Sequence, residues 1–220
     1  MSEIDQDTLA RIRSAIRYNE IGKASPYLIS FASKGNSGGS FGAYQGDAHA
    51  DQPHVTNCLT AVLLADGVDA GEAARIVGLV AGVCVENPLS DADTRRVNSA
   101  LSSDKGKALV DAMDGELEQT VTRGVQQCMA AAQARGVNLQ QAASLYVACW
   151  TNMTGAPKQL ARWLGGATTY QLAAPQGPDV SGYDVERYLL KTDYFARNPR
   201  NFDHLKQCIQ LALHPDGGGA

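Results

Sequence analysis

Hydrophobic residues recur every three or four positions along most of the chain, which is the spacing that places them on one face of an α-helix. Leu9, Ile12 and Ile16 form the first such stripe, and Asp7 stands where a helix cap is expected. We therefore predict a first helix over residues 8–20. Seven later stretches carry the same spacing: residues 55–66, 71–86, 106–134, 139–153, 156–164, 182–191 and 201–213.

Glycine, proline and capping residues separate these helices. Gly67 and Gly136 follow the ends of two of them, and Asn87-Pro88 follows a third. Ser90 and Asp93 have the spacing of a capping box, which predicts the start of another helix. The segment 167–182 contains two prolines and a glycine, so we expect a long loop there.

The helical spacing disappears between Tyr27 and Tyr44. Tyr27, Ile29 and Phe31 alternate with their neighbours, and a run of glycine, serine and asparagine follows. Alternation followed by a glycine-rich turn is typical of a β-hairpin. The predicted fold class is therefore mainly α, of the α+β kind: many helices and a small hairpin near the N-terminus.

Composition fits one globular domain. The chain has 220 residues, of which 44% are hydrophobic, enough to bury a sizeable core. We predict a single domain over residues 1–216, with the small β region at about 27–47 and a disordered tail at 217–220. Five cysteines lie far apart, mostly within apolar helical patterns, and we expect them to be reduced and buried.

Charge and hydropathy exclude some functions. The net charge is −4, so there is no basic surplus to neutralise a phosphate backbone, and nucleic acid is not an expected partner. No stretch has the apolar length of a membrane span. The sequence Met1-Ser2-Glu3-Ile4-Asp5 lacks the features of a Sec-type signal peptide, so we expect synthesis in the cytoplasm without one.

Reactive side chains are most concentrated between Glu20 and Asp47. Glu20 ends the first predicted helix, and the glycine-rich stretch after it closes on Ser40, Tyr44, Gln45 and Asp47. Glycoside hydrolysis needs one sheltered carboxyl that keeps its proton, and polar groups opposite it that hold a water or stabilise a cationic sugar. The order of residues in this stretch indicates that chemistry.

Two stretches resemble the lysozyme superfamily of glycoside hydrolases. Ser40-Phe41-Gly42-Ala43-Tyr44-Gln45-Gly46-Asp47 is similar to the Gly-Phe-Gly-x-x-Gln-x-Asp stretch of goose-type lysozymes, and Glu20 lies a comparable distance upstream. Trp150-Thr151-Asn152-Met153-Thr154-Gly155 resembles the helix ends that line the far wall of such clefts. The resemblance covers about the first quarter of the chain and this later segment, and it implies a lysozyme-like domain whose hairpin forms one wall of a cleft.

The resemblance implies roles for individual residues. Glu20 is the expected general acid, and Ser40 matches a hairpin hydroxyl that places the water in phage-type lysozymes. Asp47, or a water held by Ser40 and Gln45, is expected on the opposite face. The candidate substrate-binding residues are Tyr27, Phe41, Tyr44, Gln45, Asn152 and Thr154.

The chain departs from the family pattern in one respect. Goose-type and phage-type enzymes often carry a second acid in the turn that corresponds to Ser33–Gly39, and here that turn has none. A second carboxylate must then be Asp47 or come from elsewhere. Alternatively, Glu20 acts alone as acid and then as base, as a product with a 1,6-anhydro sugar would require.

Among substrates the sequence favours the glycan of bacterial peptidoglycan, cleaved without a cofactor by a lysozyme-like muramidase. Chitosanases line their clefts with many acids, whereas the residues near this candidate site are mostly neutral and polar. Chitosan therefore remains the alternative, as does a lytic transglycosylase acting on peptidoglycan. An antibacterial enzyme without a signal peptide would reach the wall by non-Sec delivery, through a phage holin or a contact-dependent secretion system, and could have an immunity protein as partner.

Simpler explanations exist for the same residues. Gln45 and Asp47 can cap the next element, and Trp150 and Trp163 recur at helical spacing with leucines, as core residues do. Two other functions also stay open. One is a metal-dependent hydrolase, since four possible ligands follow one another closely: Asp47, His49, Asp51 and His54. The other is a glycan-binding protein without catalysis.

Overall fold

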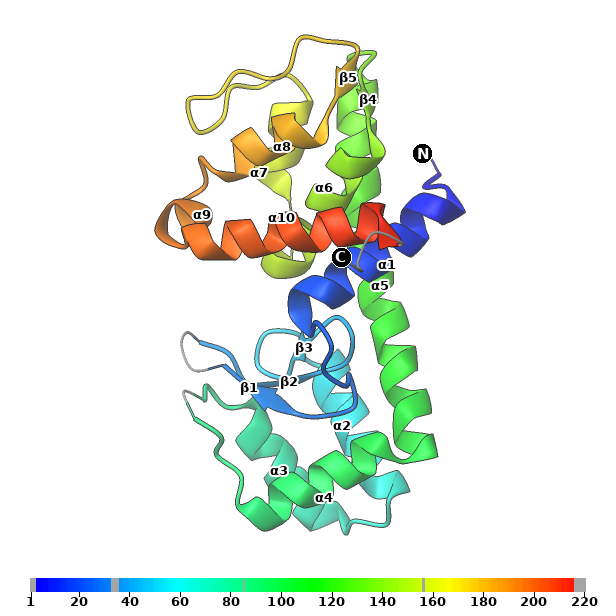
Figure 1. The fold of residues 1–220 in the computed structure, drawn as a ribbon. Helices are drawn as coiled ribbons and strands as arrows, with labels where there is room; N and C mark the ends of the chain where they lie inside the picture. The colour runs from blue at the N-terminus through cyan, green and yellow to red at the C-terminus, as the bar shows by residue number, and fades with distance from the viewer. Residues whose placement is uncertain (1–2, 33–35, 85, 156, 216–220) are drawn as a thin grey trace. The chain divides into compact units, whose positions relative to one another are not determined.

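The computed structural model describes residues 3–32, 36–84, 86–155 and 157–215 (Figure 1). Within these ranges the chain is mainly helical, with ten helices and a small antiparallel sheet near the N-terminus, so the predicted fold class is confirmed. The predicted tail at 217–220 and part of the predicted hairpin turn lie outside the described residues. The single domain over 1–216 stays a prediction.

The chain divides into two compact units. We call Lys23–Leu117 the sheet unit, and Met1–Gly22 with Glu118–Ala220 the helical unit. The sheet unit contains β1 (Ser30–Phe31), β2 (Gly39–Phe41), β3 (Gly46–Asp47), α2 (His54–Ala65), α3 (Ala70–Ala81), α4 (Asp91–Ser102) and the first part of α5 (Asp104–Gln133).

The strands of the sheet unit form an antiparallel sheet in the order β1-β2-β3. Ser30 lies opposite Ser40, and Ser40 lies opposite Asp47. The predicted hairpin is therefore confirmed as the β1–β2 pair. The third strand was missed because β3 has only two residues, Gly46 and Asp47, too few to show an alternating pattern.

The core of the sheet unit joins the sheet to its helices. Phe41 from β2 is fully buried, together with Leu59 of α2, Ile76 of α3 and Leu101 of α4. Leu59 and Ile76 belong to the apolar stripes that the helical spacing predicts. Burial of such side chains is the main favourable contribution to folding, at about 25 cal/mol per Å² of apolar surface.

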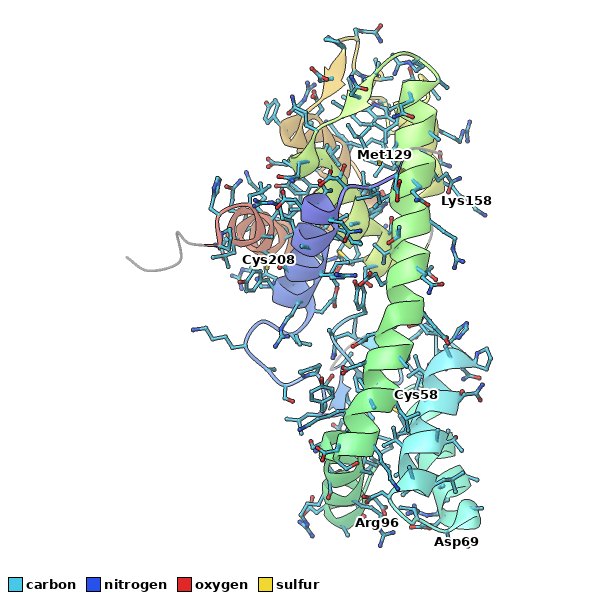
Figure 2. The ribbon with its side chains drawn as sticks, turned by 90° about the vertical axis from the view of Figure 1, so that its right-hand side faces the viewer. Cys58, Asp69, Arg96, Met129, Lys158 and Cys208 are labelled. Atoms are coloured by element: carbon cyan, nitrogen blue, oxygen red, sulfur yellow. The ribbon has the colours of Figure 1, made fainter. Side chains whose placement is uncertain are left out.

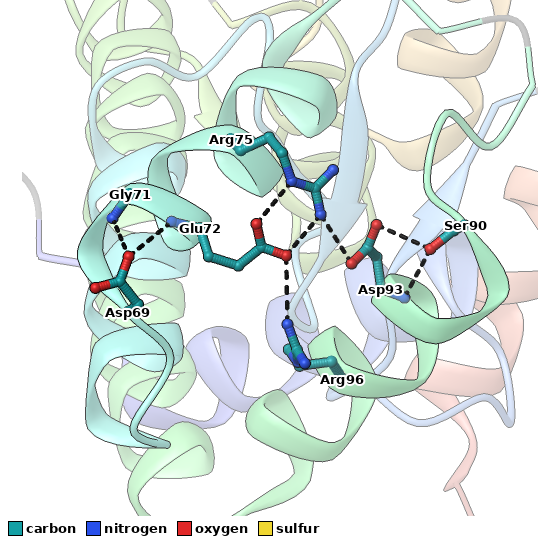
Figure 3. Close-up of polar contacts among 7 residues, drawn as sticks. All are labelled: Asp69, Gly71, Glu72, Arg75, Ser90, Asp93 and Arg96. Carbon is teal, nitrogen blue, oxygen red and sulfur yellow. Dashed lines mark hydrogen bonds and ion pairs between the residues drawn. The ribbon is translucent and has the colours of Figure 1, made fainter.

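Polar contacts cap α3 and α4 and join them (Figure 3). Asp69 caps α3 by accepting the N–H groups of its first turn. Arg75 of α3 binds Glu72 at 2.8 Å and Asp93 of α4 at 2.9 Å. Ser90 accepts the Asp93 backbone N–H at 3.1 Å, and its own hydroxyl donates to the Asp93 carboxylate. Ser90 thus caps α4, as its spacing with Asp93 predicts.

The predicted end of α3 was wrong. The helix stops at Ala81 rather than at residue 86, because the next residue, Gly82, takes an extended conformation with ψ of 161°. Glycine is a poor helix former and readily leaves the helical conformation. The apolar residues after Gly82, including the buried Cys84, continued the sequence pattern without continuing the helix.

Three helices of the helical unit, α1, α6 and α10, pack on one another, and the unit also has a parallel strand pair. Helix α1 packs against α6 and α10, and α6 packs against α8 (Figure 1). Its elements are α1 (Gln6–Glu20), the rest of α5, β4 (Asn138–Leu139), α6 (Gln141–Thr154), α7 (Lys158–Leu164), β5 (Asp179–Val180), α8 (Gly182–Leu189), α9 (Asp193–Arg197) and α10 (Pro199–Leu213).

Helix α1 begins at Gln6, two residues before the predicted start at residue 8. Asp5, not Asp7, is the cap: its carboxylate accepts the backbone N–H of Thr8 at 2.8 Å. Asp7 lies in the first turn and pairs with Arg11, four residues on, at 2.8 Å. Both acids favour the positive N-terminal end of the helix, so residue type alone did not identify the cap.

The remaining predicted helices agree with the structure to within a few residues. Helices α5, α6, α7, α8 and α10 were all expected, whereas the short α9 was not. The predicted loop at 167–182 contains β5, which pairs in parallel with β4 through Asn138 opposite Asp179. No helix in the described part of the chain is both long and apolar enough to cross a membrane.

All five cysteines are free and buried, as the sequence predicts. Cys58 lies on α2 and Cys208 on α10 (Figure 2). Burial raises the pKa of the Cys58 thiol to about 12 and that of Cys208 to about 11. These thiols therefore stay protonated near neutral pH and contribute as small apolar side chains.

Candidate active site

Glu20 is the last residue of α1, in the helical unit. Its Oε1 accepts two hydrogen bonds from side-chain amides, from Nδ2 of Asn19 at 2.9 Å and from Nδ2 of Asn152 at 3.1 Å. Asn152 comes from the last turn of α6, which packs against α1. The packing of these two helices thus brings together two residues that the sequence selected separately.

Burial is the main influence on the Glu20 carboxyl and raises its pKa above the usual value of a glutamate. The amide donors of Asn19 and Asn152 and the nearby His204 act in the opposite direction but do not cancel it. Within the described residues no lysine or arginine forms an ion pair with Glu20. The environment therefore favours the protonated acid.

His204 and Asn19 are neighbours of this carboxyl that the sequence did not single out. His204 lies on α10, and its Nε2 is 3.3 Å from the backbone oxygen of Asn19 and 3.5 Å from Sγ of Cys208. The spacing of His204 and Cys208, four residues apart on one helix, places them on one face. Nothing in the sequence showed that this face would meet the end of α1.

Asp47 has a different environment, in the sheet unit. Its Oδ1 accepts three backbone N–H groups: from Gly38 at 2.9 Å, from His49 at 2.7 Å and from Ala50 at 3.1 Å. Partial burial raises the pKa of Asp47, but the backbone donors outweigh burial and the net effect lowers it. Asp47 is therefore an ionised anchor for the loop around β3.

The possible metal ligands near Asp47 make separate contacts. Asp51 accepts the Asp47 backbone N–H at 2.8 Å. His49 Nδ1 lies 3.0 Å from a carbonyl of α3, and His54 Nδ1 lies 2.7 Å from the Glu116 carboxylate. Among the residues described, no group of three or more histidines, cysteines or acids is placed to hold a metal ion. The close spacing in the sequence does not translate into a ligand cluster.

Ser40 lies in β2 of the small sheet, and Gln45 lies in the turn between β2 and β3. Gln45 accepts the Ser30 hydroxyl at 2.8 Å and donates to the Gly42 carbonyl at 3.2 Å, with φ of +49°. Its amide therefore closes the β2–β3 turn. Ser40 is half-buried in β2, next to Asp47 of β3 in the register.

The aromatic candidates of the sheet unit have structural contacts. Phe41 is 0% exposed and Tyr44 is 7% exposed, so the Phe41 ring offers no surface to a substrate. The Tyr27 hydroxyl donates to Asp111 at 2.9 Å, and Lys107 lies over the Tyr27 ring. Tyr27 is half-buried, which leaves part of its ring accessible.

Asn152 and Thr154, the last two candidate substrate-binding residues, both lie in the last turn of α6 but make different contacts. Asn152 meets Glu20, as described above. The Thr154 hydroxyl instead donates to the Trp150 carbonyl of its own helix at 2.7 Å. Gly155 then ends the helix in the left-handed conformation, with φ of +75°.

Asp114 of α5 is a buried carboxylate that the sequence did not reveal. It is 8% exposed and accepts the backbone N–H of Ala43 at 2.8 Å and of Tyr44 at 3.4 Å. A Cβ on the preceding Gly42 would lie 2.4 Å from Asp114 Oδ1, and Gly42 has φ of +88°. An acid in the middle of a long helix is usually solvated, so its sequence position gave no signal.

The structure thus gathers the predicted residues in two groups. Glu20 and Asn152 meet in the helical unit, and Ser40, Gln45 and Asp47 lie together in the sheet unit. No family model matches the chain, and neither a curated protein nor a solved structure does.

Proposed function

We propose that the protein is a glycoside hydrolase that cleaves the glycan strand of bacterial peptidoglycan, with Glu20 as general acid. One observation carries the proposal: Glu20 is a carboxyl at a helix end whose pKa is raised by burial and whose hydrogen-bond donors are the side-chain amides of Asn19 and Asn152. A general acid must keep its proton near the working pH, and burial is how proteins achieve this with glutamate.

The hydrogen bonds suggest which oxygen carries the proton. Both amide groups, of Asn19 and Asn152, donate to Oε1 of Glu20. A protonated carboxyl has one carbonyl-like oxygen that accepts and one hydroxyl that donates. Oε1 is then the accepting oxygen, and the Oε2 hydroxyl delivers the proton to the glycosidic oxygen. Asn19 and Asn152 act as positioning residues in this step.

The contacts of Asp47 favour one variant of this function. Its Oδ1 is engaged by three backbone N–H groups, which makes it a weak base for activating water. A lytic transglycosylase needs no second carboxylate, because Glu20 gives its proton to the leaving sugar and then accepts one from the 6-hydroxyl, which closes a 1,6-anhydro ring. This second candidate uses the same substrate and the same acid.

The experiment is to incubate the protein with purified peptidoglycan, chitin and chitosan and to identify the fragments by mass spectrometry. Reducing ends from peptidoglycan support the hydrolase, and 1,6-anhydro ends support the transglycosylase. Cleavage of chitosan alone, or binding without cleavage of any of the three, overturns the proposal. Glu20→Gln should be inactive. Glu116→Gln, at an exposed glutamate on α5, is the matched control and should remain active.

A further inference from the structure

Two aromatic side chains of the helical unit lie side by side at its surface. Trp150, on α6, is partly exposed, and Tyr194, on α9, is 40% exposed. Their ring centroids are 6.3 Å apart with an angle of 64° between the ring planes. We call this pair the aromatic platform. Sequence spacing indicated a core role for Trp150, and nothing in the sequence pointed to Tyr194.

Buried rings support the platform from below. Phe195 is 1% exposed and lies 5.6 Å from the Trp150 ring, and it packs in turn on Phe202 at 5.2 Å. These two phenylalanines form the core at this point, so Trp150 and Tyr194 are its solvent-facing layer. A large exposed aromatic surface held on a rigid base is typical of a binding site rather than of a core.

A hydrogen bond fixes the orientation of the exposed ring. The Tyr194 hydroxyl accepts from Nδ2 of Asn201 at 3.0 Å, and Nδ2 of Asn198 donates to the Tyr194 carbonyl at 2.8 Å. The ring is therefore preorganised, and two exposed asparagine side chains lie beside it. Apolar faces next to a few placed polar groups are what a sugar ring requires, because its C–H groups and hydroxyls lie on different sides.

The platform is connected to Glu20 along α10. Asn201, which binds Tyr194, and His204 are three residues apart and lie on the same face of that helix, one turn from each other. His204 contacts the backbone of Asn19, whose side chain binds Glu20. A chain of contacts through Asn201, His204 and Asn19 thus links the platform to the candidate acid.

We propose that Trp150 and Tyr194 form a sugar-binding subsite in which the Tyr194 ring stacks on a pyranose ring of the glycan and Trp150 supports it edge-on, displaced along α10 from the bond that Glu20 cleaves. This inference rests on the proposed function and extends it to substrate binding. Arg197 at the end of α9 and Arg200 in the first turn of α10 are exposed, and within the described ranges neither forms an ion pair. Their charge favours a glycan that carries carboxylates, as peptidoglycan does, over the polycation chitosan.

The test measures binding of a soluble peptidoglycan fragment by calorimetry, in the Glu20→Gln background so that the fragment is not cut. Tyr194→Ala should weaken binding by about five- to tenfold, the range expected for the loss of one aromatic contact. Tyr194→Phe keeps the ring and should bind to within about twofold, which excludes the hydroxyl as the cause. Tyr183→Ala is the matched control, since Tyr183 is 67% exposed on α8.

Each outcome decides one question. Equal affinity of Tyr194→Ala and Tyr183→Ala overturns the subsite, whether or not wild type cleaves peptidoglycan. Weaker binding by Tyr194→Ala alone, with an unchanged melting temperature, supports the subsite even if wild type cleaves nothing, in which case only the proposed catalysis fails. A fall in affinity that appears together with a lower melting temperature, and that Tyr194→Phe reproduces, assigns a structural role to the Tyr194 hydroxyl and its bond to Asn201 and overturns the proposal.

Discussion

Three carboxylates of the sheet unit, Asp47, Asp93 and Asp114, have environments opposite to that of the candidate acid of the helical unit. Asp47 and Asp114 each accept backbone N–H groups, and Asp93 binds Arg75. Among the described residues, the hydrogen bonds that Glu20 accepts come from side-chain amides alone. Backbone donors and arginine stabilise the ionised form, whereas burial with neutral partners favours the protonated form.

This difference separates two roles of a carboxyl group that the sequence alone does not distinguish. A carboxylate whose backbone N–H donors outweigh its burial holds a loop in place and its pKa falls, as that of Asp47 does, whereas burial dominates at Asp51 and raises its pKa. A carboxyl that is buried without such anchors costs stability when ionised, and its pKa rises, as that of Glu20 does. Proteins accept that cost mainly where a shifted pKa serves a function.

The largest expected effect comes from removing the candidate acid. Glu20→Gln should lower the rate of glycan cleavage by about 10² to 10⁴, which is the usual contribution of a general acid. Asp47→Asn keeps an oxygen that accepts the backbone N–H groups, and we expect it to lower the rate by less than about tenfold. The measurement is the initial rate of release of soluble fragments from peptidoglycan.

Equal losses of cleavage rate in Glu20→Gln and Asp47→Asn would contradict the different roles assigned to the two carboxyl groups. They would assign Asp47 to the chemistry as the second carboxylate, despite its backbone contacts. A small loss in Glu20→Gln would remove Glu20 from the mechanism.

Asp114→Ala should have the next largest effect, on stability. It leaves the backbone N–H groups of Ala43 and Tyr44 without this acceptor, at about 1–3 kcal/mol each, so the free energy of unfolding should fall by about 2–5 kcal/mol. Urea denaturation measures this change. Asp114→Asn keeps one accepting oxygen and should lose less; a neutral result for Asp114→Ala would show that these bonds do not hold the turn.

The pH dependence of stability tests the raised pKa of Glu20. Because that pKa is higher in the folded than in the unfolded protein, the contribution of Glu20 to stability is fully present below the unfolded value and is lost as the pH rises through the folded value. Glu20→Gln should therefore match wild type at about pH 4 and be more stable at about pH 8. Unfolding free energies at both pH values provide the measurement.

The opposite sign in that experiment, with wild type more stable than Glu20→Gln at high pH, would mean that the ionised carboxyl is stabilised. The same titration governs activity. Cleavage by a protonated Glu20 should decline as the pH rises through its pKa, and the decline should be absent from the residual activity of the variant.

The smallest expected effect concerns the ion pairs of α3 and α4. Arg96→Met removes the contact with Glu72, whose atoms are 3.3 Å apart, and leaves the Arg75 bridge in place (Figure 3). Exposed pairs contribute little and are screened by salt, so the melting temperature should fall only slightly at low ionic strength and not at all in high salt. A loss that persists in high salt would indicate a packing role for Arg96.

Local patterns in the sequence predicted most of the helices. The stripe of Leu9, Ile12 and Ile16 fixes α1, and the position of Glu20 at its end follows from the length of that stripe. These features depend on residues within a few turns of one another, and so periodicity shows them. The two residues of β3 and the five of α9 are too few to carry a period and were missed, whereas the two-residue β1 lies at the end of the alternating stretch 27–31 and was found.

The sequence by itself determined the helical character of the chain, the β1–β2 hairpin and the presence of a glutamate at a helix end. Only the tertiary structure decided which acids are anchored and which donors reach the buried Glu20. Asn152 reaches Glu20 across 132 positions of sequence, and Asp114 reaches Ala43 across 71. Solvation and hydrogen bonding set the pKa of a carboxyl, and both depend on neighbours that come from distant parts of the chain.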